Sequence, residues 1–135
     1  MSSFINESEK NIQIPEGIKS IQGGMGIAAF YEKGLESVVL PNSLENIYSH
    51  AFYGNNLTEI LIPANVKFIG HQSFKNNPIT KITMTNDPAQ VNIQDRAFGI
   101  GYTESKLITD AFIEAYSSNG AGTYEWTGDK WIKTE

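Results

Sequence analysis

The side chains that could do chemistry are few in this chain of 135 residues. Cysteine is absent, which excludes a disulfide framework, a thiolate metal site and a thiol nucleophile. His50 and His71 are the only histidines, and neither stands in a motif with the serine and aspartate of a catalytic triad. Their positions in the repeat described below differ by one, so we expect the two side chains to project differently. We interpret both as histidines of surface turns and predict no catalytic residue.

Two further patterns could hold a ligand. Residues 24–29, Gly-Met-Gly-Ile-Ala-Ala, match the phosphate-binding turn G-x-G-x-x-A, but that turn binds dinucleotides only between a strand and a long helix, and here it interrupts a repeat. Asp87 and Asp95 lie near Asn86 and Asn92 without the spacing of a calcium loop. No pair among the fifteen acidic side chains is singled out for glycoside hydrolysis. The sequence therefore predicts no cofactor and no metal.

Composition and charge exclude some classes of partner. Ten basic and fifteen acidic residues give a formal net charge of -5, the wrong sign for neutralising phosphate, so nucleic acid is not an expected partner. Apolar runs such as Ile60-Leu61-Ile62 are far shorter than the roughly 18–20 residues that cross a bilayer, so we expect no membrane insertion. The first ten residues are polar and acidic, unlike a signal peptide, and the compartment is left open.

The element that must position any site is a repeat of 22 residues. Leu35-Glu-Ser-Val38-Val-Leu40-Pro41 recurs as residues 57–63 and again as residues 79–85, and an earlier copy begins at Ile12. Each copy ends in a small residue followed by phenylalanine, at Phe30, Phe52, Phe74 and Phe98. Ser3-Phe4 has the same form, so we expect the chain to start in the middle of a repeat.

The repeat predicts a stack of coils. Its alternating aliphatic residues are typical of a half-buried strand, which the following proline ends. A unit of about 22 residues cannot bury its own apolar stripe, so neighbouring coils must share a core. We expect parallel strands that place Val38, Ile60 and Ile82 in one inward column, with the phenylalanines in another. Asn55 and Asn77 are 22 residues apart, and we assign both to binding backbone groups at a turn.

These residues resemble the BspA-like branch of the leucine-rich repeats, whose template is L-x-x-I-x-I-P-x-x-V-x-x-I-G-x-x-A-F-x-x-N. Residues 57–77 match it nearly throughout, and the resemblance covers about residues 12–98. It implies a leucine-rich repeat solenoid, mainly β, with strands on both sides of each coil and a short helical turn near Ala-Phe. Insertions within residues 21–29 and 85–90 are expected to form loops.

The periodicity stops after Phe98, and the remainder predicts a cap. Residues 109–116 are predicted as a short helix with Thr109 or Asp110 as N-cap, followed by a hairpin with Gly128-Asp129 at its turn and Trp126 opposite Trp131. A solenoid needs terminal units to cover its apolar end. We therefore divide the chain into a repeat array over residues 1–98, with four repeats and a partial N-terminal one, and a capping segment over residues 99–135.

The outward positions of the first strands form the candidate binding surface. Stacking should bring alternate residues of neighbouring strands into one two-column face, with Val39 and Leu61 as exposed aliphatic neighbours. Single exposed aliphatic residues are also ordinary on protein surfaces, which is the alternative interpretation. The residues predicted to bind a partner are Ser37, Val39, Glu59, Leu61, Lys81 and Thr83.

The resemblance implies a bacterial surface or secreted protein involved in adhesion or host interaction. Our leading hypothesis is a non-catalytic protein–protein interaction module. One alternative is glycan binding through Trp126, Trp131, Tyr124 or the Tyr31/Tyr53 pair, although such tyrosines often only cover a core with their rings. Another alternative is a structural terminal segment of a larger adhesin.

Overall fold

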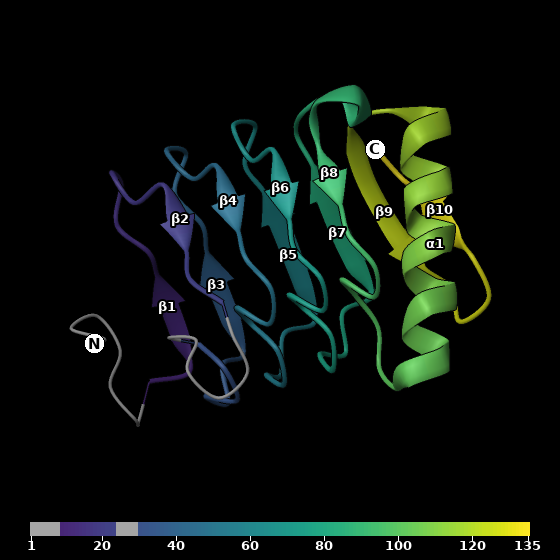
Figure 1. Cartoon of the computed structure of the whole chain (residues 1–135). Coiled ribbons are helices and arrows are strands. Elements are labelled where there is room, and N and C mark those ends of the chain that lie inside the picture. The colour runs from purple at the N-terminus through teal and green to yellow at the C-terminus, as the bar shows by residue number, and fades with distance from the viewer. Residues whose placement is uncertain (1–8, 24–29) are drawn as a thin grey trace.

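The computed structural model describes residues 9–23 and 30–135. These residues form a parallel β-solenoid whose coils follow one another from the N-terminal to the C-terminal end (Figure 1). The Gly-rich residues 24–29 and the repeat tail at Ser3-Phe4 lie outside the described residues. The solenoid architecture predicted from the repeat is confirmed.

Each coil contributes one strand to each of two faces. The first strands are β1 (Asn11–Gln13), β3 (Ser37–Val39), β5 (Glu59–Ile62) and β7 (Lys81–Met84). The second strands are β2 (Ser20–Ile21), β4 (Asn46–Ile47), β6 (Phe68–Ile69) and β8 (Asn92–Ile93), which pair in the order β2-β4-β6-β8. All of these pairings are parallel, and the two faces enclose the core (Figure 1).

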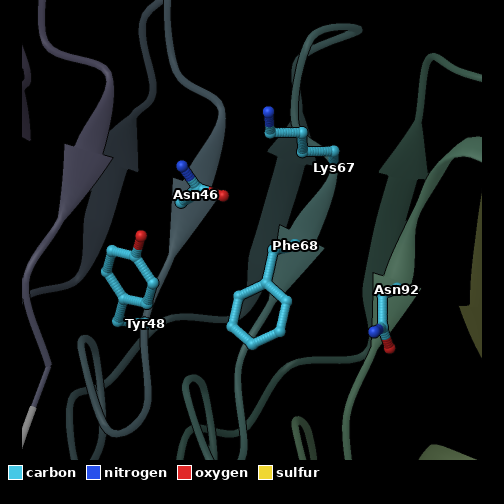
Figure 2. A pocket seen from close by; sticks show the side chains of 5 residues that line it. All are labelled: Asn46, Tyr48, Lys67, Phe68 and Asn92. Atoms are coloured by element: carbon cyan, nitrogen blue, oxygen red, sulfur yellow. The ribbon is translucent and has the colours of Figure 1, made fainter.

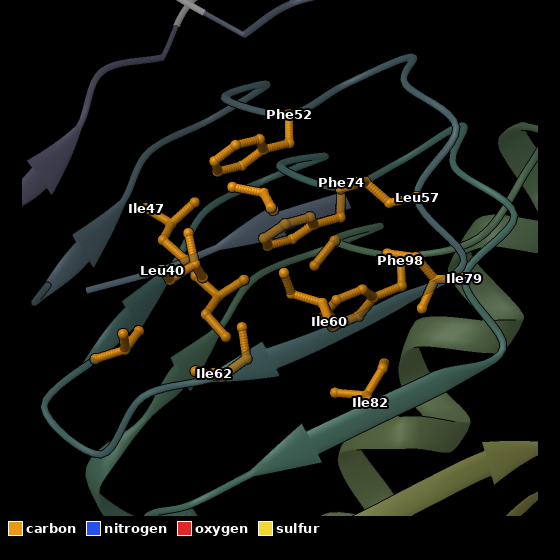
Figure 3. Close-up of a cluster of buried hydrophobic side chains, with 14 of the residues drawn as sticks. Leu40, Ile47, Phe52, Leu57, Ile60, Ile62, Phe74, Ile79, Ile82 and Phe98 are labelled. Atoms are coloured by element: carbon orange, nitrogen blue, oxygen red, sulfur yellow. The ribbon is translucent and has the colours of Figure 1, made fainter. Parts of the chain in front are cut away.

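The core consists of columns of equivalent residues. Ile60 pairs in register with Ile82, and both are buried together with Val38. The phenylalanine column is a stack of nearly parallel rings, with centroid distances of 5.1 Å from Phe30 to Phe52, 5.1 Å from Phe52 to Phe74 and 5.6 Å from Phe74 to Phe98. Figure 3 shows the last three of these rings one above another. The expected aliphatic and aromatic columns are therefore confirmed.

The asparagines at the turn bridge neighbouring coils. The Asn77 amide nitrogen donates to the carbonyl oxygens of Phe74 (3.0 Å) and Phe52 (2.8 Å), and its oxygen accepts from the backbone nitrogen of Leu57 (3.0 Å). Asn55 makes the equivalent bonds one coil earlier. Both side chains are buried, so each amide satisfies backbone groups that water cannot reach. Their predicted structural role is confirmed.

The turn near Ala-Phe is built from overlapping bonds of the 3-10 type. In one coil Ala51 donates to the Tyr48 carbonyl and Tyr53 donates to the His50 carbonyl. His50 and Gln72 occupy the same place in successive coils with φ of 63° and 57°, a left-handed conformation that stops a helix from continuing. The inserted residues 85–90 form a loop that contains a 3-10 turn, η1 (Pro88–Gln90).

Ser73 is an exception inside the core. Its buried hydroxyl has no hydrogen-bond partner among the described residues, whereas neighbouring coils hold Ala51 and Ala97 at this place. An unpaired buried hydroxyl is destabilising, so Ser73→Ala is expected to raise the free energy of unfolding by about 1 kcal/mol, measured by urea denaturation. Ser105→Ala is the matched control and should be destabilising, because the Ser105 hydroxyl donates to the Phe98 carbonyl. A Ser73→Ala variant less stable than the parent would contradict the prediction.

The cap is a helix and a hairpin packed on the last coil. Helix α1 spans Tyr102–Asn119, so the predicted helix over residues 109–116 was too short. Neither Thr109 nor Asp110 is the N-cap; Gly101 precedes the helix, and Thr109 is buried within it. Ser105 and Thr109 face the core, where their hydroxyls bond to the Phe98 carbonyl. Because these buried residues are polar, the first half of the helix lacks the apolar pattern from which a buried helix face is predicted.

The first strands form two sheets, β1-β3 and β5-β7, and the hairpin extends the second of them. Strands β9 (Gly122–Trp126) and β10 (Trp131–Lys133) pair with Trp126 opposite Trp131, as predicted. Strand β9 also pairs antiparallel with β7, so the sheet order is β10-β9-β7-β5. Tyr124 and Trp131 point inward onto Phe112 of α1, at ring-centroid distances of 5.5 and 5.2 Å.

No helix in the described part of the chain has the length and hydropathy to cross a membrane.

Candidate docking face on the first strands

The outward side chains of the first strands lie in two rows. Ser37 is in register with Asn11, Val39 with Gln13, Glu59 with Lys81, and Leu61 with Thr83. Val39 and Leu61 are 56% and 55% exposed, which leaves two large aliphatic side chains open to solvent on adjacent coils. The six residues predicted to bind a partner therefore share one surface, which we call the docking face. It is made up of Ser37, Val39, Glu59, Leu61, Lys81 and Thr83.

The polar side chains of the docking face differ in whether they are already bonded within the protein or remain accessible to a partner. The Ser37 hydroxyl donates to the Asn11 side chain at 2.6 Å, and the Thr83 hydroxyl bonds to that of Thr123 at 2.9 Å. Lys81 and Glu59 are 4.0 Å apart and both largely exposed, so their pairing leaves them accessible. The side chains available to a partner are therefore mainly the two aliphatic and the two charged ones.

The hairpin continues this surface beyond the predicted residues. Glu125 of β9 is in register with Lys81, and Ile132 of β10 is in register with Glu125. Ile132 is 42% exposed and adds a third aliphatic side chain, while Glu59, Lys81 and Glu125 form a row of alternating charge. Repeat spacing could not reveal these residues, because β9 joins β7 in the opposite direction. The alternation in Thr123-Tyr-Glu-Trp126 was the available signal.

The histidines lie together on another part of the surface. Their ring centroids are 5.8 Å apart and the ring planes cross at 75°, so the two rings meet edge to face although they come from different positions of the repeat. His50 lies in the left-handed turn position beside Gln72 of the next coil, and this brings its ring against His71. Burial lowers the pKa of His50, against the upward effect of its 3.0 Å bond to the Gln72 side chain. His71 faces Asp95 at 3.9 Å.

The candidate ligand residues have local structural contacts. Asp87 accepts a bond from the backbone nitrogen of Ala89 at the start of η1, and Asp95 pairs with Arg96 and lies 3.8 Å from Lys106. Within residues 9–23 and 30–135 no group of three or more metal-ligating side chains comes together. The glycine-rich pattern at residues 24–29 lies outside the described residues.

The aromatic residues considered for glycan binding are divided by the fold. Tyr31 and Tyr53 stack at 5.1 Å and are half-buried. Tyr124 and Trp131 are buried, and the Trp131 indole donates to the Ile108 carbonyl at 3.1 Å. The hypothesis that these two bind a glycan is wrong, because the hairpin turns their rings towards α1. Trp126 remains half-buried beside Trp131.

Stacked parallel coils with an exposed strand face and a closed C-terminal end define a solenoid of the leucine-rich repeat class. The chain belongs to the family described as BspA type Leucine rich repeat region, which matches residues 1–105 in six copies. Repeats of this family are generally non-enzymatic and suggest a protein-interaction module. Comparisons with curated proteins and with solved structures gave no match. The division at residue 98 stays a prediction.

Proposed function

We propose that this protein is a non-catalytic protein-interaction module that binds its partner through the docking face. The observation that carries the proposal is the exposure of Val39 and Leu61 at equivalent places on adjacent coils, with Ile132 at the far end of the sheet that contains Leu61. Aliphatic side chains in the centre of a surface with charges around them are typical of protein interfaces. The alternating row of Glu59, Lys81 and Glu125 would orient a partner with complementary charges.

The family supports the setting of this interaction. The resemblance to BspA-type repeats suggests adhesion or host interaction at a bacterial surface, and we propose this role for the chain. A protein partner is favoured over nucleic acid because the net charge of -5 repels phosphate. The alternative of a terminal structural segment in a larger adhesin predicts that no partner contacts the docking face.

The double variant Leu61→Ser with Lys81→Glu tests the proposal. We expect it to bind a protein partner about tenfold more weakly or worse, because it removes a central aliphatic contact and reverses a charge. The partner is first captured by a photo-crosslinking amino acid at position 61, and its affinity for each variant is then measured by calorimetry. Circular dichroism checks that the fold is unchanged.

A matched control makes the same two substitutions elsewhere. Leu107 is 65% exposed on α1 and Lys130 is exposed at the hairpin turn, so Leu107→Ser with Lys130→Glu should leave the affinity unchanged. Equal affinity of the docking-face variant and this control would show that the partner binds elsewhere. Absence of any crosslinked partner would favour the structural-segment alternative.

A further inference from the structure

We propose that the second-strand face carries a binding site for a neutral pyranose sugar, centred on Tyr48 and Phe68. The two rings line an open hollow of about 410 Å³ together with Asn46, Lys67 and Asn92. Figure 2 shows the Phe68 ring between the Tyr48 ring and the Asn92 side chain, with Asn46 and Lys67 beyond the rings. This site lies on the opposite side of the core from the docking face and does not depend on it.

The register of the second strands builds the floor of the hollow. Asn46, Phe68 and Asn92 are register partners on β4, β6 and β8, so they form one outward row. Tyr48 belongs to the next outward row, where the neighbouring coil has Gly70. A Cβ atom at Gly70 would lie 2.7 Å from the Ser49 backbone nitrogen, so this place holds no side chain. No side chain from position 70 therefore separates the Tyr48 and Phe68 rings, whose centroids lie 5.9 Å apart.

The rim of the hollow has unused hydrogen-bonding capacity. Within residues 9–23 and 30–135, the Tyr48 hydroxyl and the Asn92 side-chain amide make no hydrogen bond to protein. Asn46 uses only its amide nitrogen, in a 3.3 Å bond to Ser20, so its oxygen is also available. Both donors and acceptors thus point to solvent around two rings. The free groups are uncharged apart from Lys67, which lies 3.7 Å from Glu45.

This combination matches the chemistry of a sugar. One face of a pyranose ring presents C–H groups, which pack on an aromatic ring, while its edge presents hydroxyls that both donate and accept hydrogen bonds. Asparagine amides can bind two adjacent hydroxyls because they offer one donor and one acceptor side by side. Small-molecule sites commonly combine such apolar walls with a few convergent polar groups, in volumes of about 300–1,000 Å³.

Titration with chitotriose and cellotriose, followed by NMR of the side-chain amides, tests the site. We expect the Asn92 amide and the Tyr48 ring signals to shift, with weak affinity because the hollow is open. Tyr48→Ala should weaken binding about tenfold, and Asn92→Ala about fivefold. Both side chains are exposed, so neither change should unfold the protein.

Matched controls use the same substitutions away from the hollow. Tyr102→Ala on the 64% exposed Tyr102, Asn56→Ala and the docking-face change Leu61→Ser should all keep sugar affinity, so this proposal can fail or hold independently of the protein partner. The proposal is overturned if neither sugar shifts these signals at about 10 mM, or if Tyr48→Ala binds as tightly as the parent. It is equally overturned if Tyr48→Ala weakens only a protein partner.

Discussion

Phe74→Ala is expected to lower the free energy of unfolding by about 3–5 kcal/mol, the largest effect of any single change considered. The Phe74 ring is fully buried between those of Phe52 and Phe98, with which it stacks at 5.1 and 5.6 Å. Truncation leaves a cavity in the middle of the column and removes contacts on both sides. Rigid neighbouring coils cannot collapse into that space, because their own backbone bonds fix the spacing between them.

Chemical denaturation of the parent and the variant measures this loss. A domain of this size has a total stability of about 5–15 kcal/mol, so Phe74→Ala is expected to be close to unfolding and Phe74→Leu provides a folded intermediate case. Phe68→Ala is the matched control, since Phe68 is only partly buried, and it should cost clearly less. Equal losses at positions 74 and 68 would show that the ring column does not hold the coils together.

Asn77→Ala should lower the free energy of unfolding by about 3 kcal/mol or more. The substitution leaves two backbone groups in the interior without a partner: the nitrogen of Leu57 and the carbonyl oxygen of Phe74. The Phe52 carbonyl also loses the Asn77 bond but keeps the one from the Asn55 side chain, at 2.9 Å. Each buried polar group that loses its hydrogen bond costs about 1–3 kcal/mol. The amide also joins two coils, so the loss weakens the interface between them as well as the turn itself.

Asn56→Ala is the control for this prediction. Asn56 is exposed in the same kind of turn, and within the described residues its side chain makes no hydrogen bond, so the change should stay within about 0.5 kcal/mol. The two variants are compared by urea denaturation and by hydrogen exchange of the Leu57 amide. Protection at Leu57 that is unchanged in Asn77→Ala would contradict the assigned role.

The fold could be predicted from the sequence wherever the repeat itself determined the packing. Val38, Ile60 and Ile82 recur at one spacing, and only stacked coils bury all three. The same reasoning predicted that Asn77 binds backbone groups at its turn, whereas its bond to the Phe52 carbonyl of the neighbouring coil was not predicted. Hairpin register followed from the position of Gly128, which adopts the positive φ of 97° that its turn requires.

Features that depend on contacts outside the repeat could not be predicted in this way. The first half of α1 escaped detection because Ser105 and Thr109 occupy its buried face, where they bond to a carbonyl of the last coil. The addition of Glu125 and Ile132 to the docking face depends on which strand the hairpin joins. Tyr48 and Phe68 lie on adjacent coils but in different outward rows, so their ring contact does not follow the repeat spacing of 22 residues and was not predicted.

The parallel pairing of every coil with the next has a mechanical consequence. Backbone hydrogen bonds between coils point along the axis of the solenoid, so a force that pulls its two ends apart acts along these bonds. An end coil is held by a neighbour on one side only, and we expect it to give way first. Coils would then peel away one after another, each releasing about 22 residues or roughly 70–80 Å of extended chain. A tether built this way lengthens in steps under tension instead of breaking at a single load.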